Sequence, residues 1–250
     1  MSQVTRLDQA EIERSAKEAA EIMLGPPSND QVERYLNPPP STAFPLEYAF
    51  WLLGDIRGKA VLDIGCGSGE NIVPLVKRGA RVIGLDISPE LIALARQRLT
   101  LAKVDATLQI GSAYETGLPD ASVDLIFCVA LVHHLEIKRV REEMRRLLVK
   151  DGKIILKEPI CFSPFYARIR KLLPQRDDVS EYEHPLTPSE FAGIHESLTA
   201  NGTRYFRLPF VPLLSPIIAA RRLLKIDRWC LQTFPATSHY ATCVVTKLNA

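Results

Sequence analysis

Cysteine is scarce in this sequence, and its few copies are not spaced as pairs. The 250 residues include five cysteines, an odd number. They stand at positions 66, 128, 161, 230 and 243, with no Cys-x-x-Cys spacing among them. That pattern argues against a disulfide framework and against a zinc site. It predicts reduced thiols, and with them a cytoplasmic protein.

Long apolar runs are also missing. No segment is apolar for long enough to span a bilayer, and the first 22 residues carry charges throughout, without the apolar core of a secretion signal. The formal net charge of +2 gives no electrostatic reason to expect a nucleic acid as partner. The sequence has no internal repeat and is long enough for one large α/β domain with insertions. The oligomeric state is left open.

From residue 55 onward, short apolar runs alternate with longer amphipathic ones. This alternation predicts a parallel sheet covered by helices on both faces, which is a doubly wound α/β domain. Ser88 is expected to cap one of the helices, with Pro89 at its first position. The expected strands are 59–65, 81–87, 106–113, 123–131 and 153–159, and the expected helices are 68–79, 88–102 and 136–150.

The two flanks of this regular part are expected to serve the substrate side. Residues 1–54 are interpreted as an N-terminal helical lid segment, with a helix at about 8–24, and residues 55–250 as the main domain. Insertions on the substrate side are expected at about 160–188 and 211–235. The remaining expected elements are a helix over 188–202, a strand over 203–210, a basic amphipathic helix over about 212–232 and a last strand over 240–248.

A glycine-rich turn follows the first expected strand. Gly65, Gly67 and Gly69 are spaced G-x-G-x-G, with Cys66 among them, and Asp63 precedes the first glycine. Glycines at such a turn let the backbone approach a ligand closely. The dinucleotide fingerprint places its third glycine one residue later. A carboxylate beside the loop would repel a pyrophosphate but would attract an ammonium, directly or through water.

A second acid, Asp86, ends the next expected strand. A carboxylate in that position can accept hydrogen bonds from both ribose hydroxyls and would discriminate against a 2′-phosphate. Together the two acids and the glycine spacing favour S-adenosylmethionine, an adenosyl ligand that has an ammonium and no phosphate.

The segments VLDIGCGSGEN, GLDISPELIALAR, LPDASVDLIFCVALVHHL and LLVKDGKIILKEP resemble the class I S-adenosylmethionine-dependent methyltransferases. The nearest group is the type-11, small-molecule branch that includes the quinone C-methyltransferases, and the match covers about residues 55–160. The resemblance implies a seven-stranded Rossmann-like sheet with its last strand antiparallel, and S-adenosylhomocysteine as the product. It does not specify the substrate.

One position departs from the family pattern. Where the family usually has Gly-Asp-Ala after the third strand, this chain has Gly111-Ser112-Ala113. A serine hydroxyl is a weaker acceptor for the adenine amino group than a carboxylate. The adenine is therefore expected to rely more on apolar contacts, with Ile87 and Val129 as candidates.

Candidate catalytic residues follow the fourth and fifth strands. His133 and His134 stand where the family fold faces the methyl group, and a histidine suits a base near neutral pH. A structural role for the pair is the competing interpretation, and spacing does not say which histidine would be the base. Glu158 and His184 are weaker candidates for substrate contacts. No compact set of metal ligands is visible, so no metal is expected.

An aromatic cluster precedes the glycine turn. Tyr35, Phe44, Tyr48 and Trp51 lie in the region that forms a lid in the resembling enzymes. As a lid they would indicate a flat or apolar acceptor, and as ordinary packing they would indicate nothing.

The basic stretch at about 212–232 places Arg221, Arg222, Lys225 and Arg228 on one helical arc, with Leu223, Leu224, Ile226 and Leu231 on the rest. Such a helix either lies on a membrane surface or packs on the sheet with a solvated basic face.

The leading hypothesis is a small-molecule methyltransferase, with oxygen ahead of carbon or nitrogen as the acceptor atom. One alternative is a protein that binds S-adenosylmethionine without methyl transfer. Another is an enzyme that methylates a lipid or quinone at a membrane surface. A nucleic-acid methyltransferase lacks its Asn/Asp-Pro-Pro-Tyr or Pro-Cys signature here. The glycine spacing and Asp63 oppose a dinucleotide oxidoreductase.

Overall fold

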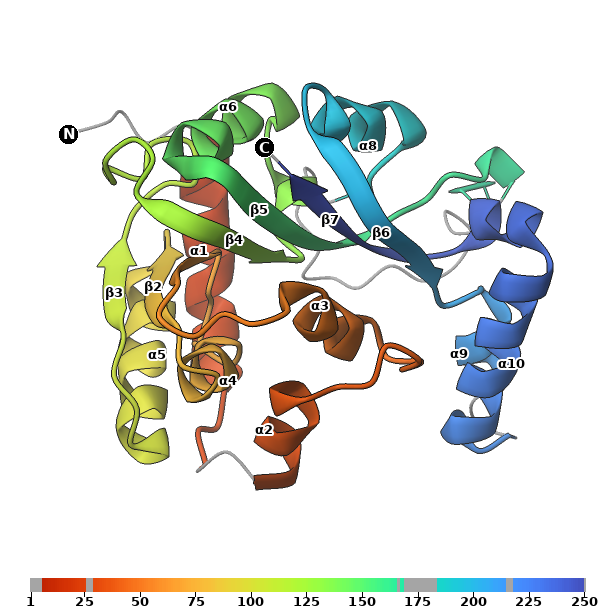
Figure 1. The fold of residues 1–250 in the computed structure, drawn as a ribbon, viewed down its shortest axis with the longest axis horizontal. Helices are drawn as coiled ribbons and strands as arrows, with labels where there is room; N and C mark the ends of the chain where they lie inside the picture. Colours follow the sequence, from red (N-terminus) through yellow and green to blue (C-terminus); the bar gives the residue numbers. More distant parts are fainter. Residues whose placement is uncertain (1–5, 26–28, 166, 169–183, 215–217, 250) are drawn as a thin grey trace.

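The computed structural model describes residues 6–25, 29–165, 167–168, 184–214 and 218–249. Its centre is a seven-stranded sheet with the strand order β3-β2-β1-β4-β5-β7-β6 (Figure 1). Strand β7 pairs antiparallel with both of its neighbours, while β1 to β5 are parallel to one another. The strands are β1 (Ala60–Ile64), β2 (Arg81–Asp86), β3 (Thr107–Ile110), β4 (Val123–Val129), β5 (Leu148–Pro159), β6 (Thr199–Phe206) and β7 (Cys243–Asn249). This confirms the predicted fold class.

Helices cover both faces of the sheet (Figure 1). The α-helices are α1 (Arg6–Glu21), α2 (Asn29–Leu36), α3 (Pro45–Leu53), α4 (Ile72–Lys77), α5 (Pro89–Ala102), α6 (Ile137–Leu147), α8 (Pro188–His195), α9 (Phe210–Leu214) and α10 (Ala220–Thr233). Two 3-10 turns, η1 (Val132–His134) and η2 (Pro235–Tyr240), complete the described elements. In the described part of the chain, no helix is both long and apolar enough to cross a membrane.

The alternation of side chains along the central strands builds two apolar cores. In β4, Leu125 and Phe127 point into the core under α3 and α4, whereas Ile126 and Cys128 point into the core under α6 and α8. Strands covered on both faces need apolar residues on both sides, which explains the continuous apolar run of β4. All five cysteines are free thiols, as their spacing predicts.

Ser88 caps α5 as its position predicts. Its side chain accepts a hydrogen bond from the Leu91 N–H at 3.2 Å, and Pro89 occupies the first turn. The backbone of Ser88 in turn donates to Asp86 Oδ1 at 3.0 Å. The start of α5 and the end of β2 are therefore fixed by the same short segment around Ser88.

Two sequence-based boundaries are wrong. The helix expected over 188–202 ends at His195, and β6 starts at Thr199, four residues before the expected strand start. Gly202, the last residue of the expected helix, lies inside β6 with φ +74°, where the pairing with β7 shifts register. A left-handed glycine serves a strand bulge as readily as a helix end.

The basic stretch at about 212–232 forms two helices, α9 and α10, rather than one. The expected division into a basic and an apolar arc holds for Arg222, Lys225 and Leu223, but not for Ile226 and Arg228. Ile226 and Trp229 are exposed beside Lys225, and Arg228 is half-buried and donates to the Ser41 carbonyl. Packing against β6 buries Leu223 and Asp227 instead, so the sheet decides which helix face points inward.

Candidate functional site

A cavity of about 520 Å³ lies at the carboxyl ends of β1, β2, β3 and β4. This edge is where open α/β sheets bind ligands. Five segments contribute to the walls: the glycine loop, the ends of β2 and β3, the turn after β4, and one face of α1. Among the lining residues are Glu11, Arg14, Glu18, Gly65, Cys66, Gly67, Asp86, Ile87, Gly111, Ala113, Val129, Leu131 and His134.

At two positions of the glycine loop, both the backbone conformation and the lack of space exclude a side chain. Gly65 has φ +70°, and its N–H donates to the Leu85 carbonyl at 2.8 Å. A Cβ there would lie 2.9 Å from the Leu131 side chain. Gly69 has φ +79°, and a Cβ there would come within 3.0 Å of Ala95 on α5. The loop is therefore held tight against β2 and α5, with its backbone facing the cavity.

Asp86 lies at the cavity wall, as expected. Its Oδ2 accepts from the Gly67 N–H at 2.8 Å, and its Oδ1 accepts from Ser88. Each carboxylate oxygen can accept a further bond, so two ribose hydroxyls could still be bound. Burial raises the pKa of Asp86, and the bonds from Ser88 and Gly67 oppose that rise.

Asp63 lies beneath the glycine loop and is not part of the cavity wall. It is 1% exposed, and its Oδ2 accepts no hydrogen bond from any described residue. Burial, and after it the charge of Asp86, raises the pKa of Asp63 to about 8. A buried acceptor without a donor calls for an unseen partner such as water or a ligand cation. Burial and the same two acids also raise the pKa of the Cys66 thiol, so that thiol stays protonated.

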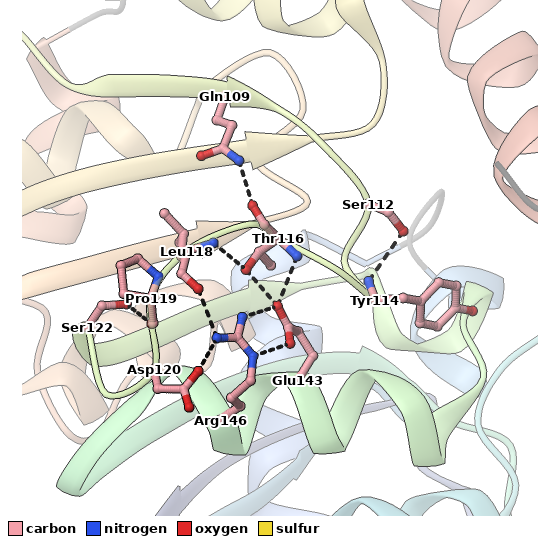
Figure 2. Close-up of polar contacts among 10 residues, drawn as sticks. All are labelled: Gln109, Ser112, Tyr114, Thr116, Leu118, Pro119, Asp120, Ser122, Glu143 and Arg146. Atoms are coloured by element: carbon pink, nitrogen blue, oxygen red, sulfur yellow. Dashed lines mark hydrogen bonds and ion pairs between the residues drawn. The ribbon is translucent and has the colours of Figure 1, made fainter. Parts of the chain in front are cut away.

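The loop after β3 is braced from below by a buried carboxylate. Figure 2 shows Glu143 accepting from the N–H and the hydroxyl of Thr116, at 2.9 and 2.7 Å, and from Arg146. This bracing holds Gly111 and Ala113 at the cavity. The Ser112 hydroxyl instead accepts from the Tyr114 N–H at 3.3 Å and is not part of the cavity wall (Figure 2). The adenine contact expected of Ser112 therefore stays a prediction.

The two adjacent histidines have different surroundings. His133 is 6% exposed, and its Nδ1 lies 2.8 Å from Glu158 Oε2. His134 lines the cavity, with its Nδ1 3.7 Å from Glu11 Oε2. His133 is therefore built into the turn, in line with a structural role. His134 faces the cavity, where a catalytic base would have to lie.

Glu158 is buried in the turn after β4, and its expected contact with substrate stays a prediction. It is 1% exposed, and its Oε1 accepts from the N–H groups of Leu131 and Val132 at 3.0 and 2.9 Å. With His133 on its other oxygen, the carboxylate fixes the whole turn after β4. The same turn holds Ala130 in a left-handed conformation with φ +55°, a strained geometry for a residue with a side chain.

Helix α1 covers the cavity, and sequence reasoning missed its residues. Glu11, Arg14, Ser15, Glu18 and Ile22 all line the cavity, at the spacing of one helical face. Arg14 donates to Glu11 at 2.5 Å. Burial opposes ionisation of Glu11, but the bond from Arg14 and the charge of His134 outweigh it and lower its pKa. The one-sided spacing of these residues was the available signal.

The aromatic cluster expected to form a lid lies away from the wall of this cavity, and its role over a substrate stays a prediction. Tyr35, Phe44, Tyr48 and Trp51 lie on and beside α2 and α3, and none of them lines the cavity. Tyr35 stacks on Phe50 and Tyr48 on Trp51, with centroid distances of 4.8 and 5.4 Å. Tyr35 and Tyr48 pack in the core on one sheet face, whereas Phe44 and Trp51 are partly exposed. The part of residues 1–54 that covers the cavity is α1.

His184 also lies away from the cavity. Its Nε2 is 2.9 Å from Glu190 Oε1, beside the capping box that starts α8. Most of the surrounding excursion, residues 169–183, lies outside the described residues. Within the described part of the chain, no group of three or more His, Cys, Asp and Glu side chains is arranged to hold a metal ion.

The donors and acceptors of the cavity fit S-adenosylmethionine. The cavity wall offers Asp86 as a hydrogen-bond acceptor and Ile87 and Val129 as apolar side chains, and the buried carboxyl of Asp63 lies beneath the glycine loop. These features define the class: an enzyme fold with a binding site for an adenosyl cofactor at the strand ends.

The family follows from comparison with known proteins. A family model described as a methyltransferase domain, type 11, matches residues 62–156. The demethylmenaquinone methyltransferase of Tropheryma whipplei is 30% identical over 180 residues, covering 64% of this chain and 73% of that protein. The chain therefore belongs to the type-11 group of class I S-adenosylmethionine-dependent methyltransferases, and S-adenosylmethionine is its cofactor.

Other known proteins are also similar to this chain. The ubiquinone biosynthesis O-methyltransferase of Xanthomonas oryzae is 27% identical, and the match covers 55% of this chain and 61% of that enzyme, less than two thirds of its length. Among solved structures, geranyl diphosphate C-methyltransferase from Streptomyces coelicolor shares the fold over 99% of both chains, with a TM-score of 0.65 and 14% identity. A sarcosine dimethylglycine methyltransferase homologue from Galdieria sulphuraria covers 82% of this chain and 85% of its own, with a TM-score of 0.59 and 17% identity.

Proposed function

We propose that this chain methylates an oxygen atom of a small-molecule acceptor, with His134 as the general base. The observation that carries the proposal is the position of His134 on the wall of the cavity that fits the cofactor. S-adenosylmethionine, when bound, supplies a methyl group on an already activated sulfonium. The protein's own work is then alignment, exclusion of water and removal of a proton from the acceptor.

His134 is suited to that last task by its neighbours. Glu11 Oε2, 3.7 Å from Nδ1, would stabilise the imidazolium formed when the ring accepts a proton. Glu11 is itself held by Arg14 on α1, so the base is complete only with α1 in place over the cavity. His133 is bonded to Glu158 in the turn and orients that turn rather than the acceptor.

The relatives support a phenolic acceptor. Two of them carry names that refer to ubiquinone and demethylmenaquinone. A hydroxyl on such a ring is a weak acid, which needs a base to become a nucleophile near neutral pH. A cavity wall with apolar residues such as Ile87, Val129 and Leu131 is compatible with a ring system.

Replacing His134 with asparagine should lower kcat by about 100-fold or more, the usual contribution of a general base. The assay offers methyl-labelled S-adenosylmethionine with panels of phenols, quinols and fatty acids, and follows label in the product. His239→Asn, an exposed histidine on η2, is the control and should keep full activity. Unchanged turnover in His134→Asn would remove the base assignment. Cofactor binding without labelled product from any panel would favour a protein that binds S-adenosylmethionine without transferring its methyl group.

The proposal extends to contact with the cytoplasmic face of a membrane through α10. Its exposed face carries Arg222, Lys225, Ile226 and Trp229, and its one acid, Asp227, is buried. Phe234, 51% exposed, follows directly and packs edge-on against Trp229 at 5.7 Å. Basic residues mixed with tryptophan and phenylalanine are typical of surfaces that lie on anionic lipid. Figure 1 shows α10 at the opposite end of the sheet from β2 and β3.

Wild-type protein should therefore sediment with phosphatidylglycerol vesicles and much less with phosphatidylcholine vesicles. The double variant Lys225→Gln, Trp229→Ser should bind at least about fivefold more weakly, since one basic residue near the surface contributes about 1 kcal/mol. Trp51→Ser, which removes a partly exposed tryptophan from α3, is the matched control. Equal binding to both kinds of vesicle, or equal loss in the control, would count against α10 as the contact.

A further inference from the structure

A second cavity, of about 180 Å³, lies between β6, α10 and Ala43. Strand β6 runs parallel to β5, because both pair antiparallel with β7. Its carboxyl end, which forms one wall, therefore lies along the same sheet edge as the cofactor cavity, beyond β5 and β7. The two cavities share no lining residue. The polar side chains of the second one are Thr203, Arg204, Tyr205, Asp227, Arg228, Gln232 and Ser238.

Two guanidinium groups share this small space. Arg204 and Arg228 both line it, and burial, then the charge of Arg228, lowers the pKa of Arg204. The acid beside them is Asp227, which is 2% exposed. Its oxygens already accept the backbone N–H groups of Arg207 and Leu208, at 3.0 and 2.6 Å. The lining thus holds two positively charged side chains and one carboxylate, and the carboxylate is already hydrogen-bonded to the backbone.

Both arginines are fixed in position before any ligand arrives. Arg204 donates to the Pro40 carbonyl at 3.2 Å and lies over the rings of Tyr48 and Phe206, 5.0 and 4.8 Å from their centroids. Arg228 donates to the Ser41 carbonyl. Pre-organised guanidiniums lose little entropy when an anion binds.

One donor in the cluster is unsatisfied. Arg228 Nε is buried and donates to none of the residues that the structure describes. A buried charged donor without an acceptor is costly, and native structures rarely keep one without water or a ligand. Thr203 is already bonded to Thr246 through its hydroxyl, at 2.6 Å, so it does not compete for the arginine.

We propose that this cavity binds a phosphate-type oxyanion through Arg204 and Arg228. The planar guanidinium fork matches phosphate oxygens, and Gln232 and Ser238 add neutral donors to the same wall. The space suits a single phosphate group and is about a third of the cofactor cavity. The phosphate is either a free ion or the head of a larger molecule. The site does not depend on the proposed methyl transfer.

The test is calorimetric titration of the full chain with inorganic phosphate at constant ionic strength. Wild-type protein should bind in a saturable way, and Arg228→Gln should bind at least about tenfold more weakly, the usual loss for one charge-assisted hydrogen bond. Lys138→Gln removes an exposed charge from α6, which does not line the cavity, and should leave the affinity unchanged. Circular dichroism at matched temperature shows whether each variant is folded. Absence of saturable binding, or equal weakening in the two variants, would overturn the site.

A second titration, with octyl phosphate, identifies the source of the phosphate. Affinity at least tenfold above that of inorganic phosphate, lost in Arg228→Gln, would support a site for the head of an amphiphilic ligand. Equal affinity for the two probes, with the same dependence on Arg228, would support a site for the free ion. Octyl phosphate binding that survives in Arg228→Gln would show a purely apolar contact and would overturn the proposal.

Discussion

Replacing Glu158 with alanine should lower the free energy of unfolding by about 3–5 kcal/mol, a large part of the stability of an ordinary domain. The carboxylate is 1% exposed and accepts hydrogen bonds from the N–H groups of Leu131 and Val132 and from the His133 ring, besides a weak one from the Cys128 thiol at 3.9 Å. Alanine would leave these donors buried without an acceptor. Urea denaturation of the two proteins measures the difference.

The loss should extend to the cavity. Leu131 and His134 both line it, and both belong to the turn that Glu158 holds. Glu158→Ala should therefore also weaken cofactor binding in protein that is still folded, whereas Glu142→Ala, on the exposed face of α6, should change neither quantity. A loss of stability below about 1 kcal/mol would mean that water replaces the carboxylate, and that the turn does not depend on it.

The sequence was sufficient to predict which residues at the strand ends line the cavity, because the backbone of the sheet determines their positions. Gly65, Gly67, Cys66, Asp86, Ile87, Ala113 and Val129 line the cavity as expected. Each of them lies at or just after the end of a parallel strand, and such ends must meet at one edge of the sheet. Ser88 was equally predictable, because an N-cap and a following proline act through their immediate neighbours.

The sequence was insufficient where long-range packing decides. Nothing local in Glu11 or Arg14 says that α1 lies across the strand ends, although the one-sided spacing of their helix face was visible. Tyr48 could equally have covered a ligand or closed a core, and the packing of α3 against β5 and β7 places it in the core. Glu158 and His134 look equally functional in sequence, and only burial separates the structural acid from the residue at the cavity.

Asp63→Asn should move the stability of the free protein and its cofactor affinity in opposite directions. In the free protein, burial and the charge of Asp86 raise the pKa of Asp63 from 3.8 to about 8. Between these two pH values the folded protein keeps a proton that the unfolded chain releases. The stability tied to this proton is fully present below pH 3.8 and falls as pH rises toward 8, by up to about 1.4 kcal/mol per pH unit.

Asparagine carries no such proton, so the stability of Asp63→Asn should fall less steeply over the same pH range. Urea denaturation at several pH values measures both slopes. Asp105→Asn, in an exposed loop before β3, is the control and should follow the wild-type slope. Identical slopes for wild type and Asp63→Asn would show that Asp63 ionises normally in the folded state.

We propose that cofactor binding reverses the preference, because the ammonium of S-adenosylmethionine, acting directly or through water beneath the glycine loop, would favour an ionised Asp63. Wild-type affinity should rise with pH between about 5.5 and 7.5, by up to about tenfold per unit, as the cost of releasing the proton falls. Asp63→Asn should bind about 10- to 100-fold more weakly at the upper end and show little pH dependence, since it lacks the charge-assisted bond. Calorimetry with S-adenosylmethionine and S-adenosylhomocysteine, which share the amino-acid end, measures both effects, and NAD serves as the ligand that should not bind. Equal affinities of the two proteins at pH 7.5 would separate Asp63 from the cofactor and leave Asp86 as the acid that selects the adenosyl group.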